Sequence, residues 1–184
     1  MGIDAFGWWE KNGKLKFQRR DVRIYNVDRQ EYLFIGQVLY ASTTERDWYA
    51  KNVYPHAKGR CLEIGLGLGV ASKAILANPN VERLLTIEQN EDVIAAFGRP
   101  LSRHIILSAD INTWVNDVPK NFQLYDFIFV DHYVYDEDLF PSLAILAEKL
   151  GLLLKPGGKM VFWIDEHAPE EEKAKLKGLG LEKD

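Results

Sequence analysis

From Gly59 onward, short apolar runs alternate with longer amphipathic stretches, and this alternation restricts the possible folds more than any other feature of the sequence. The runs have the length of strands, and their continuous apolar character is typical of strands buried on both faces of a parallel sheet. The stretches between them can form helices that return the chain to the start of the next strand. The sequence therefore predicts an α/β fold: a doubly wound, Rossmann-like and mostly parallel sheet with helices on both faces. The candidate strands are 60–65, 82–88, 104–109, 125–131 and 159–165, and the candidate helices are 70–78, 90–98, 111–117 and 138–154.

The chain before Gly59 has a different pattern. Short runs at 15–19, 22–27 and 31–40 are rich in β-branched and aromatic residues, and polar pairs separate them. They predict a small antiparallel β piece. A helix is expected over 42–55, where a hydroxyl residue can cap its start and Pro55 stops it.

These patterns predict how the chain is organised. We expect residues 1–57 to hold the N-terminal β segments and the lead-in helix, as part of the same globule as a Rossmann-like domain over 58–184. After the fifth strand the sequence has room for one short charged helix, so we expect a C-terminally shortened sheet. An exposed sheet edge of this kind favours pairing with another chain, so we expect either a homodimer or a changed substrate pocket.

Charge and composition exclude several classes of partner. The net charge of −4 and the sequence pI of about 5.6 leave no excess of basic residues for a nucleic acid backbone. The single cysteine, Cys61, allows neither an intrachain disulfide nor a thiol metal cluster. No secretory signal pattern stands at the start, and no apolar stretch approaches membrane-spanning length. We therefore expect a cytoplasmic protein with a small-molecule substrate and no metal, membrane or nucleic acid partner.

A glycine-rich turn follows the first candidate strand and opens the first helix. It contains Gly65, Gly67 and Gly69, preceded by the acid Glu63. Gly65 can adopt the positive φ of a tight turn, Gly67 leaves no Cβ in the path of a ligand, and Gly69 permits close helix packing. Glu88 ends the second strand, where an acid can bind ribose hydroxyls or, alternatively, begin a helix. Enzymes that bind NAD share this arrangement, so the turn alone leaves the ligand open.

The order of the sequence motifs is more specific. The turn E-x-G-x-G-x-G, Glu88, Asp110 after the third strand, the fourth strand YDFIFVD and the segment LLLKPGGKMVFW together resemble class I S-adenosylmethionine-dependent methyltransferases over residues 58–165. The resemblance implies that S-adenosylmethionine is the cofactor. It also implies that Gly65, Gly67 and Gly69 form its binding turn and that Glu63 holds its ammonium, directly or through water.

The resemblance also assigns the rest of the ligand. Glu88 would bind the ribose, Asp110 would receive the adenine amino group and Ile111 would pack on the purine. Asp110 is equally well placed as an N-cap of the helix that begins at Ile111. Asp131, at the end of the fourth strand, would face the reacting end of the cofactor.

The implied reaction is methyl transfer to a small-molecule amine or hydroxyl. Such an acceptor benefits from a group that takes its proton, and the segment DHYVYDED supplies the candidates Asp131, His132 and Tyr133. Within the superfamily, the glycine turn and the DHYVYDED region resemble the corresponding stretches of guanidinoacetate N-methyltransferase.

Two alternatives remain open. The N-terminal β piece followed by TTERDWYAKNVYP is similar to spermidine synthase and its relatives, which transfer an aminopropyl group from decarboxylated S-adenosylmethionine. Two departures count against that reaction: GLGLG stands in place of GGGDGG, and Val134 stands where a second gate acid is usual. The second alternative is a non-catalytic member of the fold that binds only a cofactor or a partner.

Overall fold

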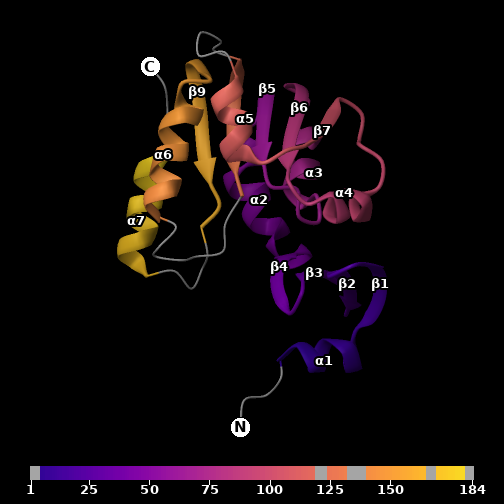
Figure 1. Cartoon of the computed structure of the whole chain (residues 1–184). Helices are drawn as coiled ribbons and strands as arrows, with labels where there is room; N and C mark the ends of the chain where they lie inside the picture. The colour runs from indigo at the N-terminus through magenta and orange to yellow at the C-terminus, as the bar shows by residue number, and fades with distance from the viewer. Residues whose placement is uncertain (1–4, 119–123, 132–139, 165–168, 181–184) are drawn as a thin grey trace.

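The computed structural model describes residues 5–118, 124–131, 140–164 and 169–180. It contains a four-stranded antiparallel sheet followed by a five-stranded parallel sheet (Figure 1). The prediction of a mostly parallel Rossmann-like sheet preceded by a small antiparallel piece is confirmed.

The N-terminal sheet is a meander of β1 (Lys14–Arg19), β2 (Val22–Val27), β3 (Gln30–Ile35) and β4 (Val38–Ser42). The polar pair Asp28 and Arg29 forms the second turn, and both residues have positive φ angles, of 49° and 67°. Positive φ at both central residues is the feature of the hairpin turns that match strand twist. The prediction of one continuous segment over 31–40 was wrong, because Gly36, with a φ of 62°, turns the chain back between β3 and β4.

One helix was not predicted. The segment α1 (Ala5–Asn12) covers the outer face of the N-terminal sheet. Phe6 packs edge-on against Tyr25 and Phe34, with ring centroids 6.2 and 5.3 Å apart. Trp9 lies against Tyr32, at a centroid distance of 4.3 Å. These aromatic contacts stabilise a helix that is too short to persist alone in water.

The lead-in helix is shorter than expected and is flanked by two 3-10 turns. It consists of η1 (Thr43–Glu45), α2 (Arg46–Asn52) and η2 (Tyr54–His56). The hydroxyl of Ser42 caps the start by accepting a hydrogen bond from the backbone N–H of Thr44. Tyr49 and Val53 are buried on one side, so α2 packs against the main sheet.

The main sheet has the strand order β7-β6-β5-β8-β9. Its strands are β5 (Gly59–Ile64), β6 (Val81–Glu88), β7 (His104–Ser108), β8 (Tyr125–Val130) and β9 (Leu154–Phe162), and its helices are α3 (Val70–Ala77), α4 (Glu91–Phe97), α5 (Ile111–Asp117), α6 (Phe140–Gly151) and α7 (Glu170–Leu179). The direction of strand addition reverses between β5 and β8. In open α/β sheets, ligands bind beside the carboxyl ends of the strands at such a reversal.

Both faces of the main sheet are covered by helices, as predicted. One face packs α2 and α3 against residues such as Cys61, Phe127 and Phe129. The other face packs α5, α6 and α7 against alternate residues such as Leu62 and Ile128. Because both sets of strand side chains are buried, the strands read as continuous apolar runs in the sequence.

The two sheets meet through α4. Leu33 of β3 joins Leu66, Leu68 and Val93 in one buried cluster. Beside it, the carboxylate of Asp92 forms ion pairs with Arg19 (2.8 Å) and Arg20 (3.3 Å). These contacts hold the N-terminal sheet over the carboxyl edge of the main sheet.

No helix in the described part of the chain is both long enough and apolar enough to cross a membrane. The expectations of a homodimer and of domain boundaries at 57 and 58 are not tested by a single chain and stay predictions.

Candidate functional site

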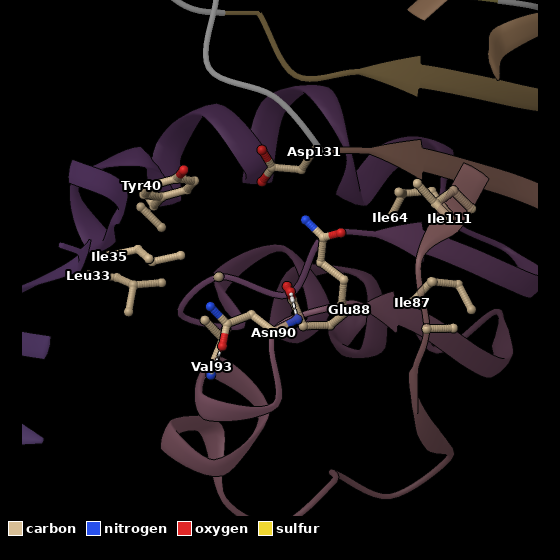
Figure 2. A pocket seen from close by; sticks show the side chains of 15 residues that line it. Leu33, Ile35, Tyr40, Ile64, Ile87, Glu88, Asn90, Val93, Ile111 and Asp131 are labelled. Carbon is tan, nitrogen blue, oxygen red and sulfur yellow. Dashed lines mark hydrogen bonds between the residues drawn. The ribbon is translucent and has the colours of Figure 1, made fainter. Parts of the chain in front are cut away.

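A cavity of about 300 Å³ lies where the N-terminal sheet faces the carboxyl ends of the main strands. Figure 2 shows Leu33, Ile35 and Tyr40 of β3 and β4 on one side of it, and on the other side Ile64 and Ile87 near the ends of β5 and β6, with Ile111 at the start of α5. The described residues that line it are Leu33, Ile35, Tyr40, Ala41, Ile64, Gly65, Gly67, Ile87, Glu88, Gln89, Asn90, Val93, Ala109, Ile111 and Asp131.

The glycine turn forms one edge of this cavity. Gly65, Gly67 and Gly69 all have positive φ angles, of 89°, 49° and 65°. Gly65 and Gly67 line the cavity, whereas Gly69 lies outside it as the N-cap of α3. A Cβ at Gly69 would stand 2.1 Å from the ring of Phe97 on α4. Gly69 therefore serves close helix packing, and its predicted role in cofactor binding stays a prediction.

Glu88 lies at the centre of the cavity, at the end of β6 (Figure 2). Its carboxylate accepts hydrogen bonds from the backbone N–H of Leu66 (3.0 Å) and of Asn90 (2.8 Å). The side chain of Asn90, not that of Glu88, caps α4 by accepting from Asp92 and Val93. The hydrogen bond from Leu66 holds the Glu88 carboxylate next to the glycine turn. A ligand that contacts both the turn and this carboxylate would require such an arrangement.

Asp131 stands at the end of β8, across the strand reversal from the glycine turn. The hydroxyl of Tyr49 donates a hydrogen bond to its Oδ2 atom at 2.9 Å and lies 3.4 Å from a carboxylate oxygen of Glu45. Burial raises the pKa of Asp131 to about 7, and the Tyr49 hydroxyl opposes that rise. A carboxyl with such a pKa can accept a proton near neutral pH.

Glu63 lies outside the cavity lining. It is fully buried on the α3 side of β5, and its Oε2 atom accepts hydrogen bonds from Ser72 and Thr86. The Thr86 hydroxyl also contacts Nε2 of His104, at 2.8 Å. Neither Oε1 of Glu63 nor Nδ1 of His104 has a hydrogen-bond partner in the described part of the chain. The predicted contact of Glu63 with a ligand ammonium stays a prediction, and this structure gives the residue a buried polar network.

This network predicts a pH-dependent stability. Burial raises the pKa of Glu63 from 4.5 to about 8, so the native state holds a proton that the unfolded state releases between these values. The free energy of unfolding should then fall as pH rises through this range. Burial lowers the pKa of His104 from 6.5 to about 4, which acts in the opposite direction below pH 6.5. The fall should therefore be clearest between pH 6.5 and 8, at up to about 1.4 kcal/mol per pH unit.

Urea unfolding of Glu63→Gln measures this effect. The glutamine carbonyl can still accept from Ser72 and Thr86, but the side chain does not titrate. We expect the free energy of unfolding to depend less steeply on pH in this variant. The steep dependence should remain in Glu82→Gln, which changes an exposed acid of β6. An unchanged slope in Glu63→Gln would contradict the assignment.

The structure separates the remaining predicted residues. Ile111 is buried and lines the cavity, beside Ala109. Asp110 is exposed, lies outside the lining and caps α5 by accepting from the Thr113 N–H at 3.0 Å. In this structure Asp110 is therefore a helix N-cap, which is the alternative role that the sequence left open for it. His132 and Tyr133 fall outside the described residues.

The wall that the N-terminal sheet contributes was not predicted from the sequence. Leu33, Ile35, Tyr40 and Ala41 belong to β3 and β4, far before the glycine turn in sequence. Alternation along a strand indicates which side chains share a face, but not what that face covers. Among the described residues, no three His, Cys, Asp or Glu side chains form a group that could hold a metal ion.

No family model and no curated protein matches the sequence. The fold does match solved structures. A spermidine synthase from Thermotoga maritima has a TM-score of 0.62 at 20% identity, and a spermidine synthase in complex with the transition state analogue AdoDATO has a TM-score of 0.59 at 20% identity. Each match covers 81% of this chain and 56% of the other, so this chain spans little more than half the length of those proteins. Over the matched part, the chain thus has the same fold as these two solved structures.

Proposed function

We propose that the chain binds an adenosyl sulfonium compound in this cavity and that it transfers an aminopropyl group from decarboxylated S-adenosylmethionine to a small amine. The observation that carries the choice of ligand is the charge of the lining. The described lining residues include two carboxylates, Glu88 and Asp131, and no Lys, Arg or His.

This charge distribution favours the decarboxylated ligand. S-adenosylmethionine carries a carboxylate besides its ammonium and sulfonium, and a buried carboxylate is costly without a cationic partner. The decarboxylated form has only the two cationic groups, which suit a lining that contains two acids. The resemblance in fold to structures of spermidine synthase supports the same choice.

The uncharged parts of the ligand also have matching surfaces. Glu88 would accept hydrogen bonds from ribose hydroxyls, and its position in the cavity at the end of a strand supports this role, which strand-end acids have in nucleotide-binding folds. Ile87, Ala109 and Ile111 form an apolar surface next to it, which suits the flat face of adenine.

The sulfonium supplies a good leaving group at a carbon that a nitrogen nucleophile can attack. In the proposed transfer, the amine nitrogen forms a bond to that carbon, the carbon–sulfur bond breaks, and its electron pair stays on sulfur as a neutral thioether. Asp131 takes the proton that the nitrogen loses, and Tyr49 orients the carboxylate for this step.

Methyl transfer is the second candidate, and one observation favours it. Glu63 occupies the acid position of the methyltransferase turn, and Leu68 stands where the spermidine synthase turn usually has an aspartate. Both reactions use the same adenosyl position, so ligand preference separates them.

Thermal unfolding with four ligands tests the proposal. The ligands are decarboxylated S-adenosylmethionine, S-adenosylmethionine, its demethylated product and NAD. A ligand that binds only the native state adds about 2.7 kcal/mol to the free energy of unfolding when its concentration is a hundred times its Kd. At equal ligand concentrations, the order of the Tm shifts therefore gives the order of the affinities. We expect the largest shift with the decarboxylated compound. A larger shift with S-adenosylmethionine would favour methyl transfer, and no shift with any of the four would favour a non-catalytic partner-binding role.

Glu88→Gln should weaken binding of the preferred ligand by about tenfold, because hydrogen bonds to a charged acceptor contribute about 1.5–3 kcal/mol. Calorimetric titration measures this change. Glu82→Gln, on the exposed part of the same strand, should bind like the unmodified chain. Equal affinity in both variants would remove Glu88 from the proposed site.

A further inference from the structure

We infer that the acceptor is a primary amine with a single charged end and an apolar body, not a diamine. This inference rests on the proposed function and adds the chemical class of the second substrate. It follows from a division of the cavity lining into two unlike regions beside the adenosyl position.

The first region is the wall formed by the N-terminal sheet. Figure 2 shows Leu33, Ile35 and Tyr40 on the side of the cavity opposite Ile87 and Ile111. The adenosyl group is assigned to the side of Ile87 and Ile111, with its ribose at Glu88. The opposite wall is then left to the acceptor.

This wall is apolar in the described structure. Leu33 is buried, Ile35 is half-buried, Ala41 is small, and Tyr40 lies at the exposed rim. The nearest acid on the same strand, Glu31, is paired with Lys16 and lies outside the lining. An ammonium placed against Leu33 and Ile35 would lose its water without gaining a carboxylate, which is strongly unfavourable.

The second region is the acidic end of the cavity. Asp131 lies there, and the Tyr49 hydroxyl holds one of its oxygens at 2.9 Å. One amine at this end meets a carboxylate that can pair with its cation and later take its proton. An acceptor with one amine and an apolar tail satisfies both regions, whereas a diamine satisfies only one.

The test compares amines of equal length on the chain saturated with methylthioadenosine, the nucleoside left after aminopropyl transfer. Calorimetric titrations measure the affinities of hexylamine, of hexanediamine with an amine at each end, and of hexanol. The comparison separates the contribution of the acidic end from that of the apolar wall. We expect hexylamine to bind at least about tenfold more tightly than either of the others, because each of these lacks one matching contact. Equal or tighter binding of the diamine would overturn the inference.

A charge placed in the wall should reverse the preference. In Ile35→Glu, the new carboxylate can pair with the second ammonium, so the diamine should gain at least about tenfold relative to hexylamine. Leu39→Glu is the matched control, since Leu39 is 43% exposed on the next strand of the same hairpin, pairs with Phe34 on the α1 side of the sheet and does not line the cavity. An unchanged order of affinities in a folded Ile35→Glu chain would contradict the assignment of this wall to the acceptor.

The design separates failure of the inference from failure of the proposed function. Methylthioadenosine is titrated first, without any amine. If it does not bind, the proposed function fails and the inference fails with it. If it binds but hexylamine has no advantage, only the choice of acceptor is wrong.

Discussion

Replacing Asp131 by Asn is expected to slow group transfer by a factor of about 100 to 10,000, the range for loss of a general base. The amide keeps the size of the side chain but cannot take the proton of the attacking amine. Binding of the adenosyl ligand should change little, because its ribose and adenine are assigned to other residues. Release of methylthioadenosine from the decarboxylated ligand, in the presence of a primary amine, measures the rate.

The pH profile of this reaction carries a second expectation. Since burial raises the pKa of Asp131 to about 7, the rate should increase with pH and level off above that value. Tyr49→Phe removes a hydrogen bond that favours the charged carboxylate, so the midpoint of the profile should move to higher pH. Asp47→Asn, which changes an exposed residue on the same helix as Tyr49, is the control. A full rate in Asp131→Asn would show that the base lies elsewhere.

Gly69→Ala should lower the free energy of unfolding by about 3 kcal/mol, through two additive costs. A side chain at a φ of 65° is strained by about 1–2 kcal/mol, and the new Cβ would approach the Phe97 ring to 2.1 Å. Urea unfolding measures the sum. Gly69 lies at the start of α3 in contact with Phe97 of α4, so a side chain there would displace the glycine turn. We therefore expect the same substitution to weaken ligand binding at the turn as well.

Gly36→Ala isolates the first of these costs. Gly36 has a similar φ of 62°, and a Cβ there would meet nothing within 4 Å. We expect this variant to lose only the backbone part, about 1–2 kcal/mol. Phe97→Leu in the Gly69→Ala chain should recover part of the packing cost. If Gly69→Ala and Gly36→Ala lower the free energy of unfolding equally, the Phe97 ring moves aside at no energetic cost.

The main sheet could be predicted from the sequence because its strands are buried on both faces. A continuous apolar run such as 125–131 indicates a buried parallel strand when segments of helical length separate it from similar runs. The glycine turn was predictable for a related reason, since Gly65 and Gly67 occupy positions where the backbone needs a positive φ.

The N-terminal layer was harder to predict. α1 depends on contacts of Phe6 and Trp9 with a sheet that follows it, and no local pattern encodes such contacts. Gly36 lies inside an apolar run, and a single glycine in a strand pattern also fits a bulge or an unbroken strand. The hairpin at Gly36 was missed for this reason.

The candidate site was predicted in part because its residues come from two kinds of position. Glu88, Ile111 and Asp131 end strands or begin helices of the main sheet, and all three line the cavity. Asp110 has the same kind of position but turns outward to cap its helix. Leu33 and Ile35 have no sequence signature for binding, because an apolar strand residue looks the same whether it faces a core or a ligand.

The ion pairs of Arg19 and Arg20 with Asp92 join two stretches of chain that contribute to the cavity separately. Substitutions between residues 30 and 42 can alter one wall of the cavity while the strands of the main sheet, which form the other wall, keep their sequence. If the proposed function holds, changes in this single hairpin would be enough to give the protein a new acceptor during evolution, with the same sulfonium donor.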